Sequence, residues 1–135
     1  MKTLTIGDLK ARIPIIQGGM GVGISLSGLA SAVANEGGIG VISAAGLGLL
    51  YKKLSPSNYT EAGNLGLAEE IRKAREKAKG IIGVNVMVAL SDFAELVKTS
   101  IAEKVDIIFS GAGLPLDLPS FLKKDSVTKL VPIVS

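Results

Sequence analysis

Short apolar runs recur along the chain and mark where strands are expected. The runs are rich in valine and isoleucine and mostly do not alternate with polar residues, which is typical of strands buried on both faces, as in parallel sheets. Buried helix segments would give a similar pattern, but these runs are short and glycines bound several of them. The predicted strands are Ile13–Gln17, Ile39–Ser43, Ile81–Asn85, Val105–Ser110 and Leu130–Ser135.

Helical patterns fill the intervals between these runs, and a polar residue precedes most of them as a helix cap. The second helix carries acidic residues near its start and lysines near its end, which suits the helix dipole, and Gly80 ends it. A fourth helix is short and begins near Pro119. The predicted caps of the first three helices are Ser25 or Ser27, Asn64 and Ser91, and the apolar face of the first is Leu26, Leu29, Ala30 and Val33.

The resulting order of elements is βαβαβαβαβ. The sequence therefore predicts an α/β fold of parallel (β/α) repeats in a single domain, residues 1–135. The second interval between strands is longer than the others and contains Leu47–Gly63. Because its Ser55-Pro56-Ser57-Asn58 portion is typical of turns, we predict an irregular excursion there.

Composition indicates one globular domain with a hydrophobic core. Hydrophobic residues make up 47% of the 135 residues and the mean hydropathy is +0.47, which excludes a disordered chain. The net charge is +3, but glutamates intersperse or precede the basic residues in the densest charged stretch, and aromatic residues make up only 4%. A solvated helix face explains that stretch better than a nucleic-acid surface does, so we expect no nucleic-acid partner.

The chain contains neither cysteine nor histidine. Disulfides, thiolate nucleophiles and Cys/His zinc sites are therefore excluded, and we expect no metal site. The N-terminal segment carries Gly7, Asp8 and Lys10 where a signal peptide needs an unbroken apolar stretch. No run reaches the roughly 18 apolar residues of a membrane span. These features predict a cytoplasmic protein with no membrane partner.

Each predicted strand ends in a neutral polar residue. Ligands of α/β folds bind at the carboxyl ends of parallel strands, so these side chains predict a ligand surface with few charges. Capping of the next helix explains Ser43 and Ser110 equally well, but it explains Asn85 poorly, because apolar residues follow Asn85. The five residues are Gln17, Ser43, Asn85, Ser110 and Ser135.

The most glycine-rich of these ends follows Gln17, where four glycines within six residues surround Met20. Glycines this dense let the backbone approach a flat or anionic ligand closely. Two well-known fingerprints are absent. Gly19, Gly21 and Gly23 form G-x-G-x-G instead of the dinucleotide-binding G-x-G-x-x-G, and the chain has no Gly-Lys-Ser/Thr of a P-loop.

A more specific pattern is formed by five segments in order: PIIQGGMG at 14–21, EGGIGVIS at 36–43, GVNVM at 83–87, DIIFSGAGLP at 106–115 and VPIVS at 131–135. Together they resemble the nitronate monooxygenase family, formerly called 2-nitropropane dioxygenase, whose close relatives include the flavin-dependent enoyl-acyl-carrier-protein reductases. The resemblance covers essentially the whole chain. It implies the N-terminal half of an FMN-binding TIM (β/α)8 barrel, incomplete in this chain.

The resemblance also implies which residues meet the cofactor, FMN. Gly19 and Met20 are expected to lie against the flavin, and Asn85 to hydrogen-bond to it. A flat, neutral isoalloxazine suits apolar contact from Met20 and a few amide or backbone hydrogen bonds. Further expected neighbours of the cofactor are Gln17, Ser43, Ser110 and Gly111.

No residue near the strand ends is a credible general base, so we assign no catalytic residue. Asp106 falls within a predicted strand, and Asp92 and Asp117 are explained as residues at helix starts. The resemblance implies that the catalytic histidine and the phosphate-binding loops follow later strands, whereas this chain stops at the fifth. We therefore expect an inactive fragment of a longer enzyme.

The activity implied for the full-length enzyme is oxidation of alkyl nitronates with dioxygen by a flavin-dependent oxidoreductase, with a small molecule and O₂ as partners. One alternative is FMN-dependent enoyl-acyl-carrier-protein reduction with a nicotinamide cofactor. Another is a half-barrel that forms a homo-oligomer or binds a partner without catalysis, because it would expose a buried-type strand edge at Leu130–Ser135.

Overall fold

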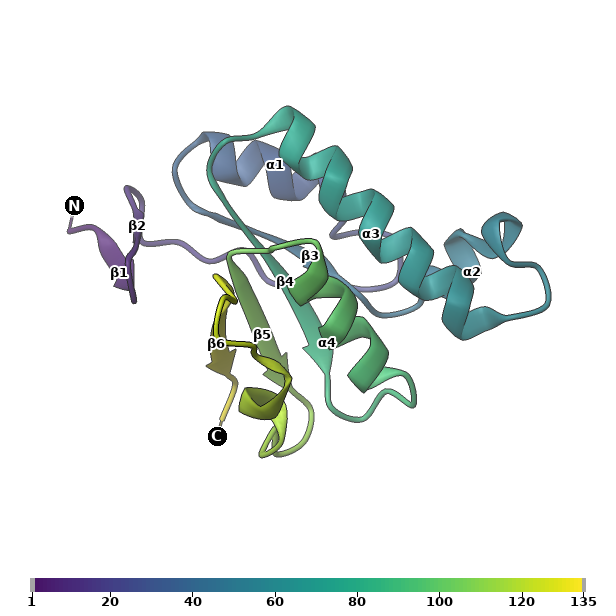
Figure 1. Cartoon of the computed structure of the whole chain (residues 1–135). Coiled ribbons are helices and arrows are strands. Elements are labelled where there is room, and N and C mark those ends of the chain that lie inside the picture. Colours follow the sequence, from purple (N-terminus) through teal and green to yellow (C-terminus); the bar gives the residue numbers. More distant parts are fainter. Residues whose placement is uncertain (1, 135) are drawn as a thin grey trace.

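A computed structural model describes residues 2–134 and contains a four-stranded parallel sheet (Figure 1). The strands lie in the order β3, β4, β5, β6, and each neighbouring pair is parallel. The predicted α/β class is confirmed. Ser135, the end of the last predicted strand, lies outside the described residues. The strands are β3 (Ile39–Ser43), β4 (Ile81–Met87), β5 (Ile107–Gly111) and β6 (Lys129–Pro132).

Three helices cover one face of this sheet (Figure 1). They are α1 (Ser27–Asn35), α3 (Tyr59–Lys77) and α4 (Phe93–Ala102). Alternate strand residues, among them Val84 and Ile108, point to this side and form the larger hydrophobic core with the helices. We call this the helix-facing side of the sheet and the opposite side its inner face. Among the helices of residues 2–134, none is long and apolar enough to cross a membrane.

Helix α1 packs directly on the backbone of β3. A Cβ atom on Gly40 would lie 1.9 Å from the Ala30 carbonyl oxygen, so only glycine permits this approach. The contact face of α1 consists of small residues such as Ala30 and Ala34. The predicted apolar face is therefore wrong in part, because Leu29 is 43% exposed.

The segment 47–63 is structured, and the predicted irregular excursion is wrong. It contains α2 (Leu47–Leu50), the 3-10 helix η1 (Lys52–Leu54) and the first turn of α3. Asn58 is the N-cap of α3, and its side-chain oxygen accepts the Glu61 N–H at 3.0 Å. An asparagine before a helix and an asparagine in a turn use the same local hydrogen bonds, so the pattern did not distinguish them.

The predicted caps of the first three helices are wrong. Neither Ser25 nor Ser27 caps α1 through its side chain, because the residue at the N-cap position is Leu26. Asn64 lies inside α3, five residues after its start. Helix α4 begins after Asp92, one residue later than a Ser91 cap requires.

The fourth predicted helix is the short 3-10 helix η2 (Leu118–Phe121), with Asp117 at its N-cap position. Asp117 is thus a helix-start residue, as predicted. Helix α3 ends at Lys77, three residues before the predicted stop at Gly80.

Residues 13–17 approach the edge of the sheet without forming a regular strand. One parallel bridge joins Ile16 to Ile39, and the Gln17 N–H donates to the Ile39 carbonyl at 3.0 Å. The Ile15 N–H donates to the Ile13 carbonyl at 2.8 Å and not to β3, so the first predicted strand does not form a continuous ladder. Beyond this bridge the side chain of Gln17 makes the contact with β3, as described below.

An antiparallel hairpin precedes this segment and was not predicted. Its strands, β1 (Leu4–Ile6) and β2 (Leu9–Ala11), are too short to show a periodic pattern. The hairpin packs with Ile39 and Ile107, the first residues of their strands, on the inner face. It therefore covers the amino end of the sheet, where β3–β6 begin, and the loops lie over the carboxyl end, where these strands finish.

Candidate functional site

A glycine-rich loop, residues 18–26, crosses the carboxyl end of the sheet. A Cβ atom on Gly19 would lie 2.5 Å from the Cβ of Asn85 in β4, and one on Gly21 would lie 3.2 Å from the Ser43 hydroxyl oxygen in β3. The loop backbone therefore lies against two neighbouring strand ends, a distance that only glycine allows at Gly19. The fold brings together Gly19, Ser43 and Asn85, three of the predicted site residues.

Ser25 holds this loop in place. Its hydroxyl donates to the Gly18 carbonyl at 3.1 Å and accepts the Met20 N–H at 2.9 Å and the Gln17 side-chain amide at 3.1 Å. Its own carbonyl accepts the Ser43 N–H at 2.9 Å, and the residue is buried. One donor and two acceptors are all that a hydroxyl offers, so this side chain is fully used. Sequence reasoning considered Ser25 only as a helix cap and missed this role.

Gln17 is bound by the sheet. Its side-chain N–H donates to the Val41 carbonyl at 2.9 Å, and its side-chain oxygen accepts the Val41 N–H at 3.1 Å. The amide group thus imitates a peptide unit and continues the pairing that stops at Ile16. Gln17 lies beside the loop, but its side-chain amide already has partners within the protein.

Asn85 is different, because its side-chain amide has no hydrogen-bond partner within residues 2–134. The residue is half-buried and is aligned with Ser43 on one side and Phe109 on the other. Phe109 belongs to the inner-face core, so Asn85 points to the inner face as well. An amide supplies two donors and an acceptor, all of which are available here to a ligand.

Met20 extends from the middle of the same loop and is 58% exposed. Its backbone is held by Ser25, through the hydroxyl and through the Ser25 N–H, which donates to the Met20 carbonyl at 2.9 Å. A flexible apolar side chain on a fixed backbone is suited to contact a flat ring.

Ser110 does not join this group. Its partner in the ladder, Val86, packs among the helix-facing residues, and its neighbour Phe109 packs on the inner face. Alternation therefore places the Ser110 side chain on the helix-facing side, across the sheet from Asn85. Its hydroxyl is buried and, within residues 2–134, is the one buried side-chain polar atom without a partner.

Gly111 follows at the carboxyl end of β5, aligned with Met87, and a Cβ there would lie 2.9 Å from Ile133. It shares this end of the sheet with Asn85. Neither Ser43 nor Ser110 caps a helix, since Gly46 and Asp117 occupy the following N-cap positions. That alternative explanation for the two serines is therefore wrong.

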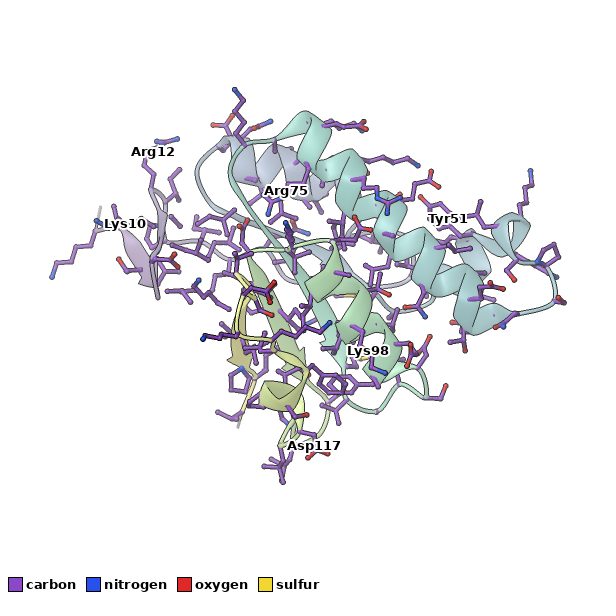
Figure 2. All side chains as sticks on the ribbon, in the orientation of Figure 1. Lys10, Arg12, Tyr51, Arg75, Lys98 and Asp117 are labelled. Carbon is purple, nitrogen blue, oxygen red and sulfur yellow. The ribbon has the colours of Figure 1, made fainter. Side chains whose placement is uncertain are left out.

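The Asp106 carboxylate lies away from the loop. Asp106 precedes β5 at the amino end of the sheet, just outside the strand, where its carboxylate accepts hydrogen bonds from Arg75 at 2.7 Å and from the Ile82 N–H at 2.8 Å. Figure 2 shows Arg75, on α3, and Asp117, in the segment after β5, far apart in the molecule. Residues 2–134 contain no group of three or more acidic side chains that could hold a metal ion. The predicted site residues at the carboxyl end of the inner face are themselves uncharged.

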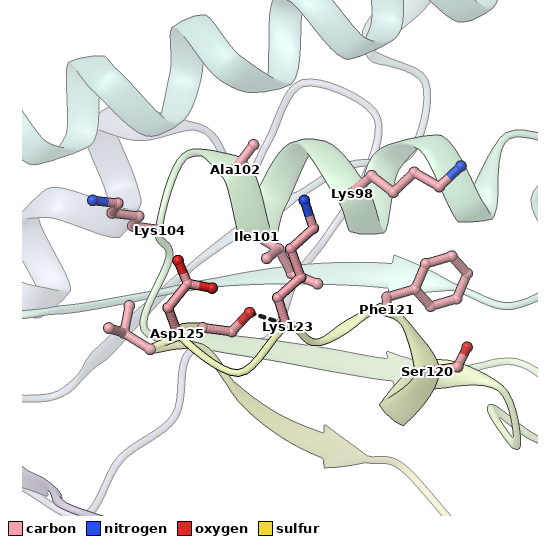
Figure 3. Close-up of a pocket in the computed structure, with 10 residues that line it drawn as sticks. Lys98, Ile101, Ala102, Lys104, Ser120, Phe121, Lys123 and Asp125 are labelled. Atoms are coloured by element: carbon pink, nitrogen blue, oxygen red, sulfur yellow. Dashed lines mark hydrogen bonds between the residues drawn. The ribbon is translucent and has the colours of Figure 1, made fainter.

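A cavity of about 690 Å³ lies elsewhere, between α4 and the segment 120–127. Figure 3 shows Ile101 and Phe121 beside it and the side chains of Lys98 and Lys123 extending from the two elements that form it. It lies in the helix layer, and none of the predicted site residues lines it. We therefore place the candidate site at the glycine-rich loop and not in this cavity.

Comparison with known proteins shows which family and fold the chain resembles. A family model for nitronate monooxygenase matches residues 2–134. The chain is similar to FabK from Thermotoga maritima, with a TM-score of 0.67 and 29% identity over 90% of this chain and 34% of that chain. A methionine-to-alanine mutant of FabK gives a TM-score of 0.71 and 32% identity over 90% of this chain and 35% of that chain.

The chain therefore spans about a third of the length of these solved structures. A search of curated proteins returned no match. Together with the parallel sheet, the structural matches confirm the predicted fold, which is a set of (β/α) repeats forming the N-terminal portion of a barrel.

Proposed function

The chain belongs to the nitronate monooxygenase family, and from this premise we propose that it is the N-terminal, ring-binding part of an FMN-dependent oxidoreductase. The proposal treats residues 1–135 as a single domain that supplies one side of a flavin pocket. The observation that carries it is the Asn85 amide, which has no partner within residues 2–134 and lies against the backbone of Gly19.

The residues present fit the ring of a flavin. An isoalloxazine is flat and uncharged, and it presents amide-like donors and acceptors along one edge. Asn85 offers a complementary amide, Gly19 offers backbone with no side chain in the way, and Met20 offers an exposed apolar surface. None of these three residues carries a charge, which also suits a neutral ring better than a phosphate.

FMN, when bound, supplies the electron-transfer chemistry, and this chain's residues bind and orient it. Asn85 would hold the ring through hydrogen bonds of its side-chain amide. Gly19 and Met20 would contact the ring and exclude water from it, and the Ser25 hydroxyl holds the loop backbone through Gly18 and Met20. Ser43, Gly111 and Gln17 form the surroundings at the same end of the sheet. Ser110 contributes to the helix-facing core.

The proposed reaction of the full-length enzyme is oxidation of an alkyl nitronate, with dioxygen as the electron acceptor. The similarity to FabK favours a second candidate, reduction of an enoyl thioester with a nicotinamide cofactor. Steady-state assays of a longer protein that contains this chain separate the two. Turnover of a nitronate with oxygen uptake supports the first proposal, whereas turnover of an enoyl thioester with NAD(P)H alone overturns it.

We propose that the 135-residue chain alone is inactive and binds FMN weakly. Oxidation of nitronate by the purified chain above the uncatalysed rate would contradict this proposal.

Self-association is a separate candidate, favoured by the apolar residues beyond β6, of which Ile133 is 52% exposed and Val134 74% exposed. Light scattering decides this point, because a stable dimer supports the proposal and a monomer at all concentrations contradicts it.

A further inference from the structure

The start of helix α1 is held by a carboxylate from another helix. Glu70, in the middle of α3, accepts the Ser27 N–H at 2.6 Å, and Ser27 is the first residue of α1. The two residues are separated by 43 positions in the sequence. A carboxylate at a helix N-terminus satisfies an N–H that has no partner within the helix and suits the helix dipole. Glu70 therefore provides the N-terminal cap that α1 lacks locally.

No local side chain takes this role. Leu26 occupies the N-cap position and offers no oxygen, and the hydroxyl of Ser25 is fully used by the glycine-rich loop. The first turn of α1 contains no acidic residue. The glycine-rich loop is thus held by Ser25, and the start of α1, which follows the loop, is held by Glu70.

The Glu70 side chain is buried, and several neighbouring groups bind its carboxylate. The residue is 4% exposed, its second oxygen accepts the Tyr51 hydroxyl, and the Lys73 ammonium lies 3.9 Å away. Lys73 in turn pairs with Glu69 at 2.6 Å. Burying a carboxylate is costly unless its oxygens have hydrogen-bond partners, and both oxygens have them here.

We propose that Glu70 is a positioning residue for the glycine-rich loop and thereby raises the affinity for FMN. The Glu70 carboxylate accepts the Ser27 N–H. Ser25, two residues earlier, binds Gly18 and Met20 through its hydroxyl. The Ser25 carbonyl also accepts the Ser43 N–H, so the loop is clamped between the sheet and the helix layer. The effect on FMN rests on the proposed function, whereas the effect on the loop does not.

The test compares Glu70→Gln with Glu69→Gln in the 135-residue chain. Glu69 is the adjacent carboxylate, shares Lys73 as a partner, and is on the outer surface of α3. Hydrogen exchange of the flavin-free proteins measures the loop, and quenching of FMN fluorescence measures affinity. We expect Glu70→Gln to speed exchange of the Ser27 and Met20 amides about tenfold and to weaken FMN binding by a similar factor, and Glu69→Gln to change neither.

A second variant, Ser27→Pro, removes the donor N–H and leaves Glu70 in place. Proline is favoured at the first position of a helix, and the extended backbone of Leu26 is compatible with a following proline. We expect the Met20 amide to exchange faster in this variant too, which keeps the test valid if Glu70→Gln does not fold.

Unchanged Met20 exchange in a folded Glu70→Gln or Ser27→Pro protein overturns the proposal. Faster exchange with unchanged FMN affinity overturns the link to the cofactor. If the unmodified chain does not bind FMN, the proposed function fails, and the exchange measurement still decides the role of Glu70.

Discussion

The two ends of the sheet use their polar groups in opposite ways. At the amino end, the Asp106 carboxylate is shared by Arg75 and the Ile82 N–H, Lys129 pairs with Asp8 at 2.6 Å, and the hairpin covers the inner face. At the carboxyl end, the Asn85 amide has no partner in residues 2–134, and Met20 is exposed. The polar groups named at the amino end are bound within the protein, whereas at the carboxyl end the Asn85 amide is available to a ligand.

This difference agrees with a general property of (β/α) barrels, in which the carboxyl end carries the chemistry and the amino end carries stability. It also yields a clear experimental separation. Substitutions at the amino end should change the free energy of unfolding and leave FMN affinity alone, and substitutions at the carboxyl end should do the reverse.

The largest effect is expected for Gly19→Ala. The added Cβ would lie 2.5 Å from the Asn85 Cβ, so either the loop or Asn85 must move. We expect FMN affinity to fall by about 100-fold, the size of effect that a displacement of about 1 Å produces at a site of this kind. Gly18→Ala is the matched control, because a Cβ there meets no atom within 4 Å. Equal FMN affinities of the two variants, measured by fluorescence titration, would disprove the close contact.

The opposite result is expected for Asp106→Ala at the amino end. The substitution leaves the Ile82 N–H without its acceptor and removes one of the two acceptors of Arg75, so it should lower the free energy of unfolding by about 2 kcal/mol. FMN affinity of the folded protein should not change. Asp125→Ala, at an exposed position, serves as the control for removing a carboxylate. Urea denaturation with and without FMN measures both quantities, and a loss of FMN affinity in Asp106→Ala would break the comparison.

A smaller and more selective effect is expected for Asn85→Ala. Because the amide has no partner in residues 2–134, its removal should change the free energy of unfolding by less than about 0.5 kcal/mol. FMN binding should weaken about tenfold through the lost hydrogen bonds. Asn35→Ala is the control, since the Asn35 amide donates to the Lys77 carbonyl, away from the loop. A large loss of stability in Asn85→Ala would show that the amide is used internally.

The smallest effect is the pH dependence of the Glu70 contact. Burial alone would raise the pKa of Glu70, but hydrogen bonds from Tyr51 and Ser27 outweigh burial and hold its pKa below the ordinary value of 4.5, with the Lys73 charge acting in the same direction. Because the folded pKa is lowered, the contribution to stability is present above the ordinary value and disappears as pH falls through the lowered one.

The difference in unfolding free energy between the unmodified chain and Glu70→Gln should therefore be constant near neutral pH and shrink in acid. Denaturation curves from about pH 7 to about pH 3 measure it. A difference that grows toward low pH would contradict the direction of the pKa shift.

The strands of the parallel sheet could be predicted because their short apolar runs are rich in valine and isoleucine, and β3 matches its predicted bounds. The residues that cap α1 and α3 could not be predicted. Glu70 caps α1 from another helix, and Asn58, which caps α3, lies in a segment that resembles a turn. The hairpin strands have only three residues each, so no periodicity exists to detect them.

For the candidate site, position after a strand correctly brought Gly19, Ser43 and Asn85 together. The position of a residue after a strand does not show whether its polar side chain already has a partner within the protein. The Gln17 amide, for example, is hydrogen-bonded to the backbone of Val41. The prediction also did not consider that side chains alternate between the two faces of a strand, which places Ser110 on the helix-facing side. Because Phe109 is an apolar residue of the inner face, the next residue, Ser110, must point to the opposite face.

The most direct test of the proposed flavin site is an FMN titration of the isotopically labelled chain followed by amide NMR, which detects weak binding residue by residue. We predict that saturating FMN shifts the backbone signals of Gly19 and Met20 and both the backbone and side-chain signals of Asn85. The signals of Arg75 and Asp106 at the amino end should stay unchanged. Shifts concentrated at the amino end or around the cavity beside α4, or no shift at Gly19 and Asn85, would contradict the account.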